Sequence, residues 1–513
     1  LPGGTRMAIA RSYPYDALSF DPLKQTGTWR EEVRVNGRSP WITTFNAPTR
    51  LLTSISPVGR RIETLVDTAG RVLSDSVPGL TRVTLRYDIH GRDSLLQQGD
   101  RGWRYGYDEE GRLATFRDTL GHMTTFQYDD AGRLLQEVLP GGRVVQFTYD
   151  PNGNLKSITP PEGSVHEFDY TTVDLPDRYR PPTAGLAASA TQYRYDLDRQ
   201  LTRIERPDSS NVTLSYETSP NSGRLASIAM PRGTIGLYYH ATSGRLDHVT
   251  SHDTVTVNYS YDGPVVTSEG WNGKVIGSVG HTYNADLLPT TQSVNAGSTV
   301  GFGYDDDGLL TSAGELTLTR SPENGFVTGT ELGAVTTTET RNSFGELEHY
   351  SAQAGATTLY EAEYIRDALG RVTEVTETID GVPVVKAFAY SDSGFLKSVT
   401  ENAVVIERYG YDGNGNRMRF EGVTAADTAT ASYDDQDRML RYADTTYSYT
   451  AAGELSQKES GSDITSYTYD PLGNLVTAVL PSGDRIDYVI DGQGRRVGRK
   501  LNGVLERQWL YQN

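Results

Sequence analysis

Two groups of side chains in this sequence are of the types that bind metal ions. His248 and His252 lie four residues apart with His240 nearby, but residues at that spacing lie close together only on a helix. The surrounding pattern is one of strands and turns, so a helical His-x-x-x-His zinc site is not expected. The Asp-rich segments 305–308 and 412–416 lack the remaining ligands of a calcium loop, and turn chemistry already accounts for them. We therefore predict no metal and no cofactor, with calcium binding as the open alternative.

Catalytic motifs are also scarce. The sequence contains no Gly-x-Ser-x-Gly, no His-Glu-x-x-His and no phosphate-loop lysine. Gly413 and Gly415 do not form a nucleotide loop, because no helix is expected after them. Paired carboxylates are frequent in so Asp-rich a chain, and none stands out as a catalytic pair. We predict that the chain has no catalytic residues and is not an enzyme.

Most of these carboxylates belong to an internal repeat of about 21 residues. Seven copies carry the strict pattern Tyr-Asp-x-x-Gly. We assign the Tyr, Asp and Gly of these copies a structural role in turns. The seven copies are Tyr87, Asp88 and Gly91; Tyr107, Asp108 and Gly111; Tyr128, Asp129 and Gly132; Tyr149, Asp150 and Gly153; Tyr304, Asp305 and Gly308; Tyr411, Asp412 and Gly415; and Tyr469, Asp470 and Gly473. A residue present in every repeat is more often part of a scaffold than of a catalytic site.

The repeat has the pattern of a β-hairpin. In one copy, Thr124, Phe126 and Tyr128 alternate on one strand face. The Asp that follows suits the first position of a type I turn, and the Gly suits the left-handed position that produces a bulge. Residues 133–139 then form the return strand. Each unit therefore consists of a strand, a turn, a strand and a second turn.

The repeats divide the chain into a short beginning and one long array. Residues 1–28 form an N-terminal lead-in, and residues 29–513 form a single continuous array. Within the array we expect a long loop near 171–192 and a less regular stretch at 308–350. The array stops at Tyr511, where a further repeat is expected to begin.

Composition agrees with a repetitive all-β protein. The 513 residues include 32 Tyr and 53 Gly, and 36% are hydrophobic, which suits a curved wall better than a packed globule. The absence of Cys excludes disulfides within the chain. A net charge of −18 argues against a nucleic-acid partner, and no apolar stretch is long enough for a membrane span. Tyr on strand faces is expected to pack between hairpins, with glycans as a possible partner.

These motifs resemble the YD-repeat (Rhs) family, which includes Rhs polymorphic toxins, toxin-complex shell subunits and teneurins. The blocks 301–310 and 491–498 are similar to the bacterial branch. The resemblance implies an all-β fold in which a spiralling sheet of repeated β-hairpins winds into a hollow shell, or cocoon. In bacterial members such a shell encloses a C-terminal toxin segment, whereas in teneurins it is part of a cell-adhesion ectodomain. The family's self-cleaving aspartates belong to a C-terminal core that would begin about where this chain stops.

The resemblance leads to three hypotheses. The first is a non-enzymatic encapsulating shell segment of a bacterial Rhs-type polymorphic toxin, which sequesters a downstream toxin segment. Its partners would be the chain's own C-terminal core and toxin, and an N-terminal shell-closing domain or secretion machinery. The second is a teneurin-like cell-surface adhesion or carbohydrate-binding protein, and the third is an enzyme such as a glycosidase. The first two imply a secreted or cell-surface location.

Overall fold

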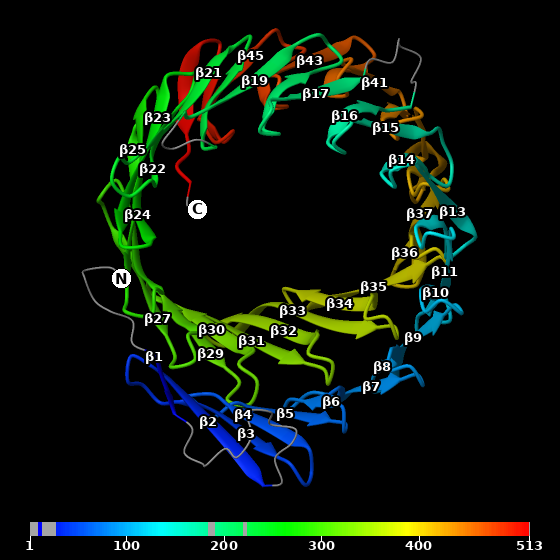
Figure 1. Cartoon of the computed structure of the whole chain (residues 1–513), viewed down its shortest axis with the longest axis vertical. Coiled ribbons are helices and arrows are strands. Elements are labelled where there is room, and N and C mark those ends of the chain that lie inside the picture. Colours follow the sequence, from blue (N-terminus) through cyan, green and yellow to red (C-terminus); the bar gives the residue numbers. More distant parts are fainter. Residues whose placement is uncertain (1–8, 13–26, 183–189, 219–222, 512–513) are drawn as a thin grey trace.

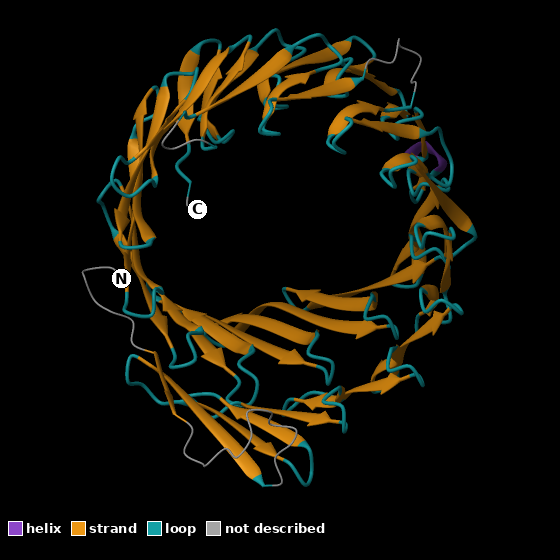
Figure 2. Ribbon diagram, in the orientation of Figure 1, coloured by secondary structure: helices purple, strands orange, loops and turns teal. Residues whose placement is uncertain are grey.

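The computed structural model describes residues 9–12, 27–182, 190–218 and 223–511. These residues form one antiparallel sheet of 47 strands, in which each strand pairs with the next strand in sequence. In Figure 2 almost the whole ribbon is drawn as strands and the loops between them. A short 3₁₀ helix, η3 (Ala425–Asp427), is the one helical element among the described residues. The all-β prediction is confirmed.

The sheet winds round a central space in two coils (Figure 1). The first coil follows β1 (Ile9–Ser12) and runs from the bottom of the view through cyan to green. Its strands are β2 (Thr28–Val35), β3 (Trp41–Asn46), β4 (Leu51–Ile55), β5 (Arg61–Val66), β6 (Val72–Ser76), β7 (Val83–Tyr87), β8 (Asp93–Gln98), β9 (Arg101–Tyr107), β10 (Leu113–Arg117), β11 (Met123–Tyr128), β12 (Leu134–Leu139), β13 (Arg143–Tyr149), β14 (Leu155–Thr159), β15 (His166–Tyr170), β16 (Pro176–Arg180), β17 (Thr191–Tyr195), β18 (Leu201–Glu205), β19 (Asn211–Tyr216), β20 (Leu225–Met230), β21 (Gly233–Tyr239), β22 (Leu246–Thr250), β23 (Val255–Asp262), β24 (Val265–Gly273) and β25 (Gly277–Tyr283).

The second coil continues through yellow to red and ends at the chain terminus (Figure 1). Its strands are β26 (Pro289–Val294), β27 (Thr299–Tyr304), β28 (Leu310–Ala313), β29 (Leu316–Arg320), β30 (Val327–Leu332), β31 (Val335–Arg341), β32 (Leu347–Ala354), β33 (Thr357–Arg366), β34 (Val372–Ile379), β35 (Val382–Tyr390), β36 (Leu396–Glu401), β37 (Val404–Tyr411), β38 (Arg417–Glu421), β39 (Ala429–Tyr433), β40 (Met439–Tyr442), β41 (Thr445–Tyr449), β42 (Leu455–Ser460), β43 (Asp463–Tyr469), β44 (Leu475–Val479), β45 (Arg485–Ile490), β46 (Arg496–Leu501) and β47 (Val504–Gln508).

The sequence sets three segments apart, and the structure describes one of them in full. Residues 308–350, where less regularity is expected, hold β28 to β31 and the start of β32 in the same antiparallel order. Alternating Thr and aliphatic residues there suit strands even without a strict motif. Within the loop expected near 171–192, residues 176–180 form β16, and 183–189 lie outside the described residues. Most of the lead-in 1–28 also lies outside them.

The Asp of each strict motif holds its turn together, and Asp88 shows how. Its Oδ1 accepts the backbone N–H groups of His90 and Arg92, at 2.8 and 2.9 Å. Its Oδ2 accepts Arg92 Nε at 2.7 Å. Burial acts to raise the pKa of Asp88, but the backbone and side-chain hydrogen bonds from Arg92 outweigh it and lower that pKa to about 2. The carboxylate is therefore ionised at neutral pH.

Gly and Tyr complete the unit. In the seven strict copies the Gly adopts φ between +80° and +95°, a region that a Cβ disfavours. The register of the sheet shifts by one residue at the Tyr, for example between Gln127 and Tyr128. The hydroxyl of Tyr128 donates to the carbonyl of Leu113 at 2.8 Å, which ties the unit to the one before it. We call these turns the YD turns and the turns at the opposite strand ends the return turns.

Candidate functional site

The two coils meet along a seam between turns. The seam joins YD turns of the second coil to return turns of the first coil, across sequence separations of 220 to 271 residues. Because YD and return turns lie at opposite ends of the strands, the YD turns of the first coil, such as the one at Asp88, lie on its other rim. The seam therefore joins coil to coil through turns and side chains.

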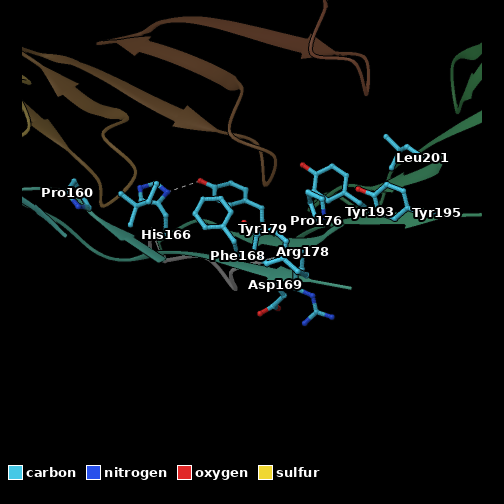
Figure 3. A pocket seen from close by; sticks show the side chains of 12 residues that line it. Pro160, His166, Phe168, Asp169, Pro176, Arg178, Tyr179, Tyr193, Tyr195 and Leu201 are labelled. Atoms are coloured by element: carbon cyan, nitrogen blue, oxygen red, sulfur yellow. Dashed lines mark hydrogen bonds between the residues drawn. The ribbon is translucent and has the colours of Figure 1, made fainter. Parts of the chain in front are cut away.

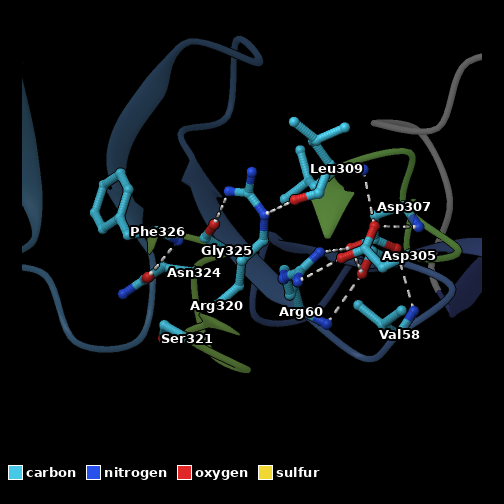
Figure 4. Close-up of polar contacts among 12 residues, drawn as sticks. Val58, Arg60, Asp305, Asp307, Leu309, Arg320, Ser321, Asn324, Gly325 and Phe326 are labelled. Carbon is cyan, nitrogen blue, oxygen red and sulfur yellow. Dashed lines mark hydrogen bonds and ion pairs between the residues drawn. The ribbon is translucent and has the colours of Figure 1, made fainter. Parts of the chain in front are cut away.

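Near its beginning the seam is polar, as Figure 4 shows. Arg60, in the return turn after β4, donates to Asp305 Oδ2 at 2.8 Å and to Asp307 Oδ2 at 2.5 Å. Asp307 also accepts the Ser56 hydroxyl at 2.7 Å and the Val58 backbone N–H at 3.2 Å. Burial acts to raise the pKa of Asp305, but the hydrogen bonds from the Leu309 backbone and from Arg60 lower it.

The polar seam continues along the coils with charged and amide side chains. Arg101 forms a two-point contact with Glu346, at 2.7 and 2.9 Å, and its guanidinium lies 3.7 Å from the centre of the Phe344 ring. The hydrogen bond from Arg101 lowers the pKa of Glu346, although burial opposes it. Farther along, Asn414 Oδ1 accepts the backbone N–H of Glu162 at 2.8 Å.

The far end of the seam is apolar and closed. One buried cluster there contains residues of both coils. Its members are Val255, Val257, Trp271, Val275 and Val279 of the first coil and Val489 and Val497 of the second coil. Trp271 is 1% exposed, and residues 510 and 511 pack on the same cluster. Here the last hairpins of the second coil bury apolar surface against β23 to β25.

A charged group lies inside this apolar end. Asp491 is fully buried, and its Oδ2 accepts Trp271 Nε1 at 3.2 Å and Arg495 Nε at 2.8 Å. Arg495 also donates to Glu269 Oε2 at 3.0 Å. Burial acts to lower the pKa of Arg495, but the charges of Asp491 and Glu269 raise it, so the guanidinium stays protonated. This is the same Asp-x-x-Gly-Arg turn as at Asp88, placed in a buried environment.

An aromatic cavity of about 730 Å³ lies on the first coil, over β14 to β18 (Figure 3). Six rings line it, those of His166, Phe168, Tyr170, Tyr179, Tyr193 and Tyr195. Ile158, Pro160, Pro176 and Leu201 complete its apolar wall, and Asp169 and Arg178 also border it. The volume is in the range of ligand-binding pockets.

The polar groups that face the rings of the cavity include those of His166 and Tyr179, and both are neutral. His166 Nδ1 and the Tyr179 hydroxyl form a hydrogen bond of 2.8 Å, and the two rings stack 6.1 Å apart. Burial lowers the pKa of His166 and raises that of Tyr179. In Figure 3 the Asp169 carboxylate and the Arg178 guanidinium point away from the rings, on the other side of the strands.

The three histidines considered as metal ligands each make a different contact. His248 contacts Asp247 through Nδ1 at 2.7 Å and stacks on Tyr238, whereas His252 is buried in a return turn at the seam. His240 Nδ1 lies 3.4 Å from the Thr242 hydroxyl. Among residues 9–12, 27–182, 190–218 and 223–511, no three His, Cys, Asp or Glu side chains are grouped so as to hold a metal ion. The same residues include no helix long and apolar enough to cross a membrane.

The strict motif residues separate into two sets. The structure places the YD turns of Asp305, Asp412 and Asp470 on the side of the second coil that faces the seam. The YD turns of the first coil lie on its other rim, away from the seam. Sequence reasoning missed both the seam and the aromatic cavity. The change from Arg133 to Asn154 after the turn Gly did not mark the cavity, because Asn416 and Asn474 occupy the same position in other repeats.

Comparison with known proteins gives a family match over nearly the whole chain. The family model described as Teneurin YD-shell matches residues 10–513. Human Teneurin-4 is 24% identical over 305 residues, which cover 56% of this chain and 11% of Teneurin-4. Zebrafish (Danio rerio) Teneurin-3 is 25% identical over 348 residues, which cover 65% of this chain and 12% of that protein. The matched residues thus span only about a ninth of the length of these relatives.

Solved structures with a similar fold come from toxin complexes. A crystal structure of TcdB2–TccC3 superposes with a TM-score of 0.63 at 14% identity, covering 96% of this chain and 34% of that chain. The Tc holotoxin pore of Photorhabdus luminescens superposes with a TM-score of 0.62 at 14% identity, covering 92% of this chain and 32% of that chain. At this identity the likeness concerns the fold.

Proposed function

We propose that this chain, which belongs to the teneurin YD-shell family, forms part of the wall of a non-enzymatic shell that encloses a polypeptide segment. The two coils wind round a central space (Figure 1), and the seam joins them into a continuous wall. This arrangement is the observation that carries the proposal. A wall needs no reactive groups, and the charged side chains of the seam are occupied in contacts between the coils.

The direction in which the chain leaves the sheet supports an enclosed segment. After β47, the backbone N–H of Trp509 donates to Val497, and Leu510 and Tyr511 pack on the apolar cluster at the end of the seam. In Figure 1 the red end of the chain lies inside the ring. A polypeptide continuing from this point would start within the enclosed space.

The finer form of the proposal is a shell segment of a bacterial Rhs-type polymorphic toxin, secreted and holding a downstream toxin segment. The fold likeness to the toxin-complex structures supports it. The partner would then be the chain's own continuation rather than a separate molecule.

Protection from protease tests the proposal. A protease-sensitive, unfolded reporter is fused after Asn513, and the same reporter is fused before Leu1 as the control. We expect the first fusion to be cut much more slowly than the second. Arg60→Asp and Arg101→Glu together reverse the charges of the polar seam and should expose the reporter. Equal digestion of the two fusions would contradict enclosure.

A second candidate, teneurin-like adhesion at a cell surface, is favoured by the sequence relatives, which are teneurins. The test is binding of the purified chain to cells and to an array of glycans. Saturable binding together with an unprotected reporter would favour adhesion over enclosure.

A further inference from the structure

An arginine covers the tyrosine ring of the following unit through much of the structure. The guanidinium of the Arg that closes one YD turn lies 4.3 to 5.4 Å from the centre of the ring of the next unit's Tyr. The nine pairs of this kind among the described residues are Arg71 and Tyr87, Arg92 and Tyr107, Arg112 and Tyr128, Arg133 and Tyr149, Arg224 and Tyr239, Arg245 and Tyr261, Arg371 and Tyr390, Arg438 and Tyr449, and Arg495 and Tyr511. Such contacts are favourable because the ring face is electron-rich.

This series is interrupted at several units, and two of the interruptions fall at the aromatic cavity. Asn154 occupies the position of the arginine before Tyr170, and Leu175 occupies it before Tyr195. The turn geometry is otherwise kept, since the Asp150 N–H donates to the carbonyl of Asn154, and the Thr171 N–H to that of Leu175. Tyr170 and Tyr195 both line the cavity. At the cavity, therefore, the preceding turns supply no guanidinium for the rings of Tyr170 and Tyr195.

The same substitution leaves a carboxylate without its usual cation. Asp129 pairs with Arg133, with Oδ2 accepting Nε at 2.7 Å. In the next unit Asp150 Oδ2 accepts instead from the uncharged amide of Asn154, at 3.1 Å. This turn therefore lacks the arginine charge of the turn before it, and it precedes a group of half-buried rings.

We propose that the aromatic cavity binds an organic cation, an ammonium or guanidinium group of a ligand, which takes the position that arginine holds in those nine pairs. Six rings surround a space large enough for such a group and the part of the ligand that carries it. The one arginine that borders the cavity, Arg178, points its guanidinium to the other side of the strands (Figure 3). His166 is neutral at neutral pH, so it does not repel a cation.

The cation has two possible sources with the same chemistry. It is either a free small molecule with an ammonium group or a Lys or Arg side chain of a polypeptide. The site does not depend on the proposed shell function, because its geometry is complete within β14 to β18.

Titration of the whole chain with three probes tests the proposal. The probes are tetramethylammonium, a short peptide containing Lys and Arg, and tert-butanol as a neutral molecule of similar shape, each followed by calorimetry. We expect saturable binding of at least one cation and none of tert-butanol at the same concentrations. Binding of the peptide alone identifies a side chain as the ligand, and binding of tetramethylammonium identifies a free cation. Equal binding of the neutral molecule, or no binding of either cation, would overturn the proposal.

Two variants and a control distinguish a specific site from non-specific binding. Tyr195→Leu removes a ring and should lower the affinity for the cation by about tenfold or more. Asn154→Arg introduces an arginine at the position that it holds in other units and keeps every ring. Its guanidinium should occupy the cavity and prevent the ligand cation from binding. Tyr149→Leu, whose ring is covered by Arg133, should bind as the unmodified chain does. Circular dichroism checks that each variant is folded. An Asn154→Arg variant that is folded and binds with unchanged affinity would refute the assignment.

Discussion

The two ends of the seam join the same pair of coils by different means. At the first end, Arg60 reaches across to Asp305 and Asp307, and all three side chains keep some contact with solvent. At the far end, Trp271 and Asp491 are buried among valines. A hydrogen-bonded ion pair contributes little net energy, because each partner loses its hydration when the pair forms. Apolar burial at the far end stabilises far more per residue, and it makes any charge within it sensitive to the loss of its partner.

The comparison indicates that the far end closes the structure and that the polar end sets which turn faces which. The same Asp-x-x-Gly-Arg turn is used in both surroundings, at Asp88 on the outer rim and at Asp491 within the apolar end. Substitutions of one residue type at both places therefore measure the difference directly. Urea unfolding and hydrogen exchange of the strands at each end provide the readout, because an array of repeats need not unfold in a single step.

The largest difference is expected for tryptophan. Trp271→Ala removes a ring that is 1% exposed and leaves a cavity, at a cost of about 3–5 kcal/mol in the free energy of unfolding. Trp41→Ala, at a residue 42% exposed on the first coil, should cost less than about 1 kcal/mol. Hydrogen exchange should accelerate in β23 to β25 and β45 to β47 only for Trp271→Ala. Equal losses at the two positions would remove the distinction between the seam ends.

The next effect concerns the buried carboxylate. Asp491→Asn leaves the charge of Arg495 with Glu269 as its remaining carboxylate partner, and we expect a loss of about 3 kcal/mol. Asp88→Asn makes the same chemical change on the outer rim, where water replaces the lost partner, and its effect should be clearly smaller. The measurement is the urea midpoint of each variant. A larger loss for Asp88→Asn would show that turn geometry, rather than burial, governs the motif.

A smaller effect is expected at the neighbouring turn position. A Cβ on Gly492 would lie 2.2 Å from a methyl carbon of Val249, so Gly492→Ala forces the seam apart and should cost about 1–3 kcal/mol. The equivalent position of the rim turn is Ile89, which is 96% exposed, so Ile89→Ala should change stability by less than about 0.5 kcal/mol. If Gly492→Ala unfolds at the same urea concentration as the unmodified chain, the packing at the far end is looser than described.

The smallest effect is expected at the polar end, and it depends on pH. Arg60→Met should cost about 1 kcal/mol at neutral pH. The pKa of Asp305 is lowered in the folded state, so the pair stabilises fully above the unfolded value of about 3.9. That contribution is lost as the pH falls through the folded pKa. The difference between the unmodified chain and Arg60→Met should therefore shrink below about pH 4. A difference that grows on acidification would mean that Asp305 is not the partner that matters.

The sequence by itself determined the hairpins and their order. Every contact that defines a unit lies within a few residues of its motif, such as Asp88 with Arg92, or in the next unit, such as Tyr128 with Leu113. Local turn chemistry and strand alternation are therefore enough to predict an antiparallel all-β array, and the family resemblance supplies its winding into a shell. The turn Gly, with φ of +80° at Gly132, follows from the same local reasoning.

Only the tertiary structure decided which turns meet across the coils. The separation of 245 residues between Arg60 and Asp305 depends on the curvature accumulated over more than twenty strands, and small twists at each strand add up. Asp491 and Asp88 share the Asp-x-x-Gly-Arg pattern, yet Asp491 is fully buried against Trp271 whereas Asp88 is only partly buried. The aromatic cavity likewise needs six rings from neighbouring strands to face one space, and that is set by the folded sheet and not by any single repeat.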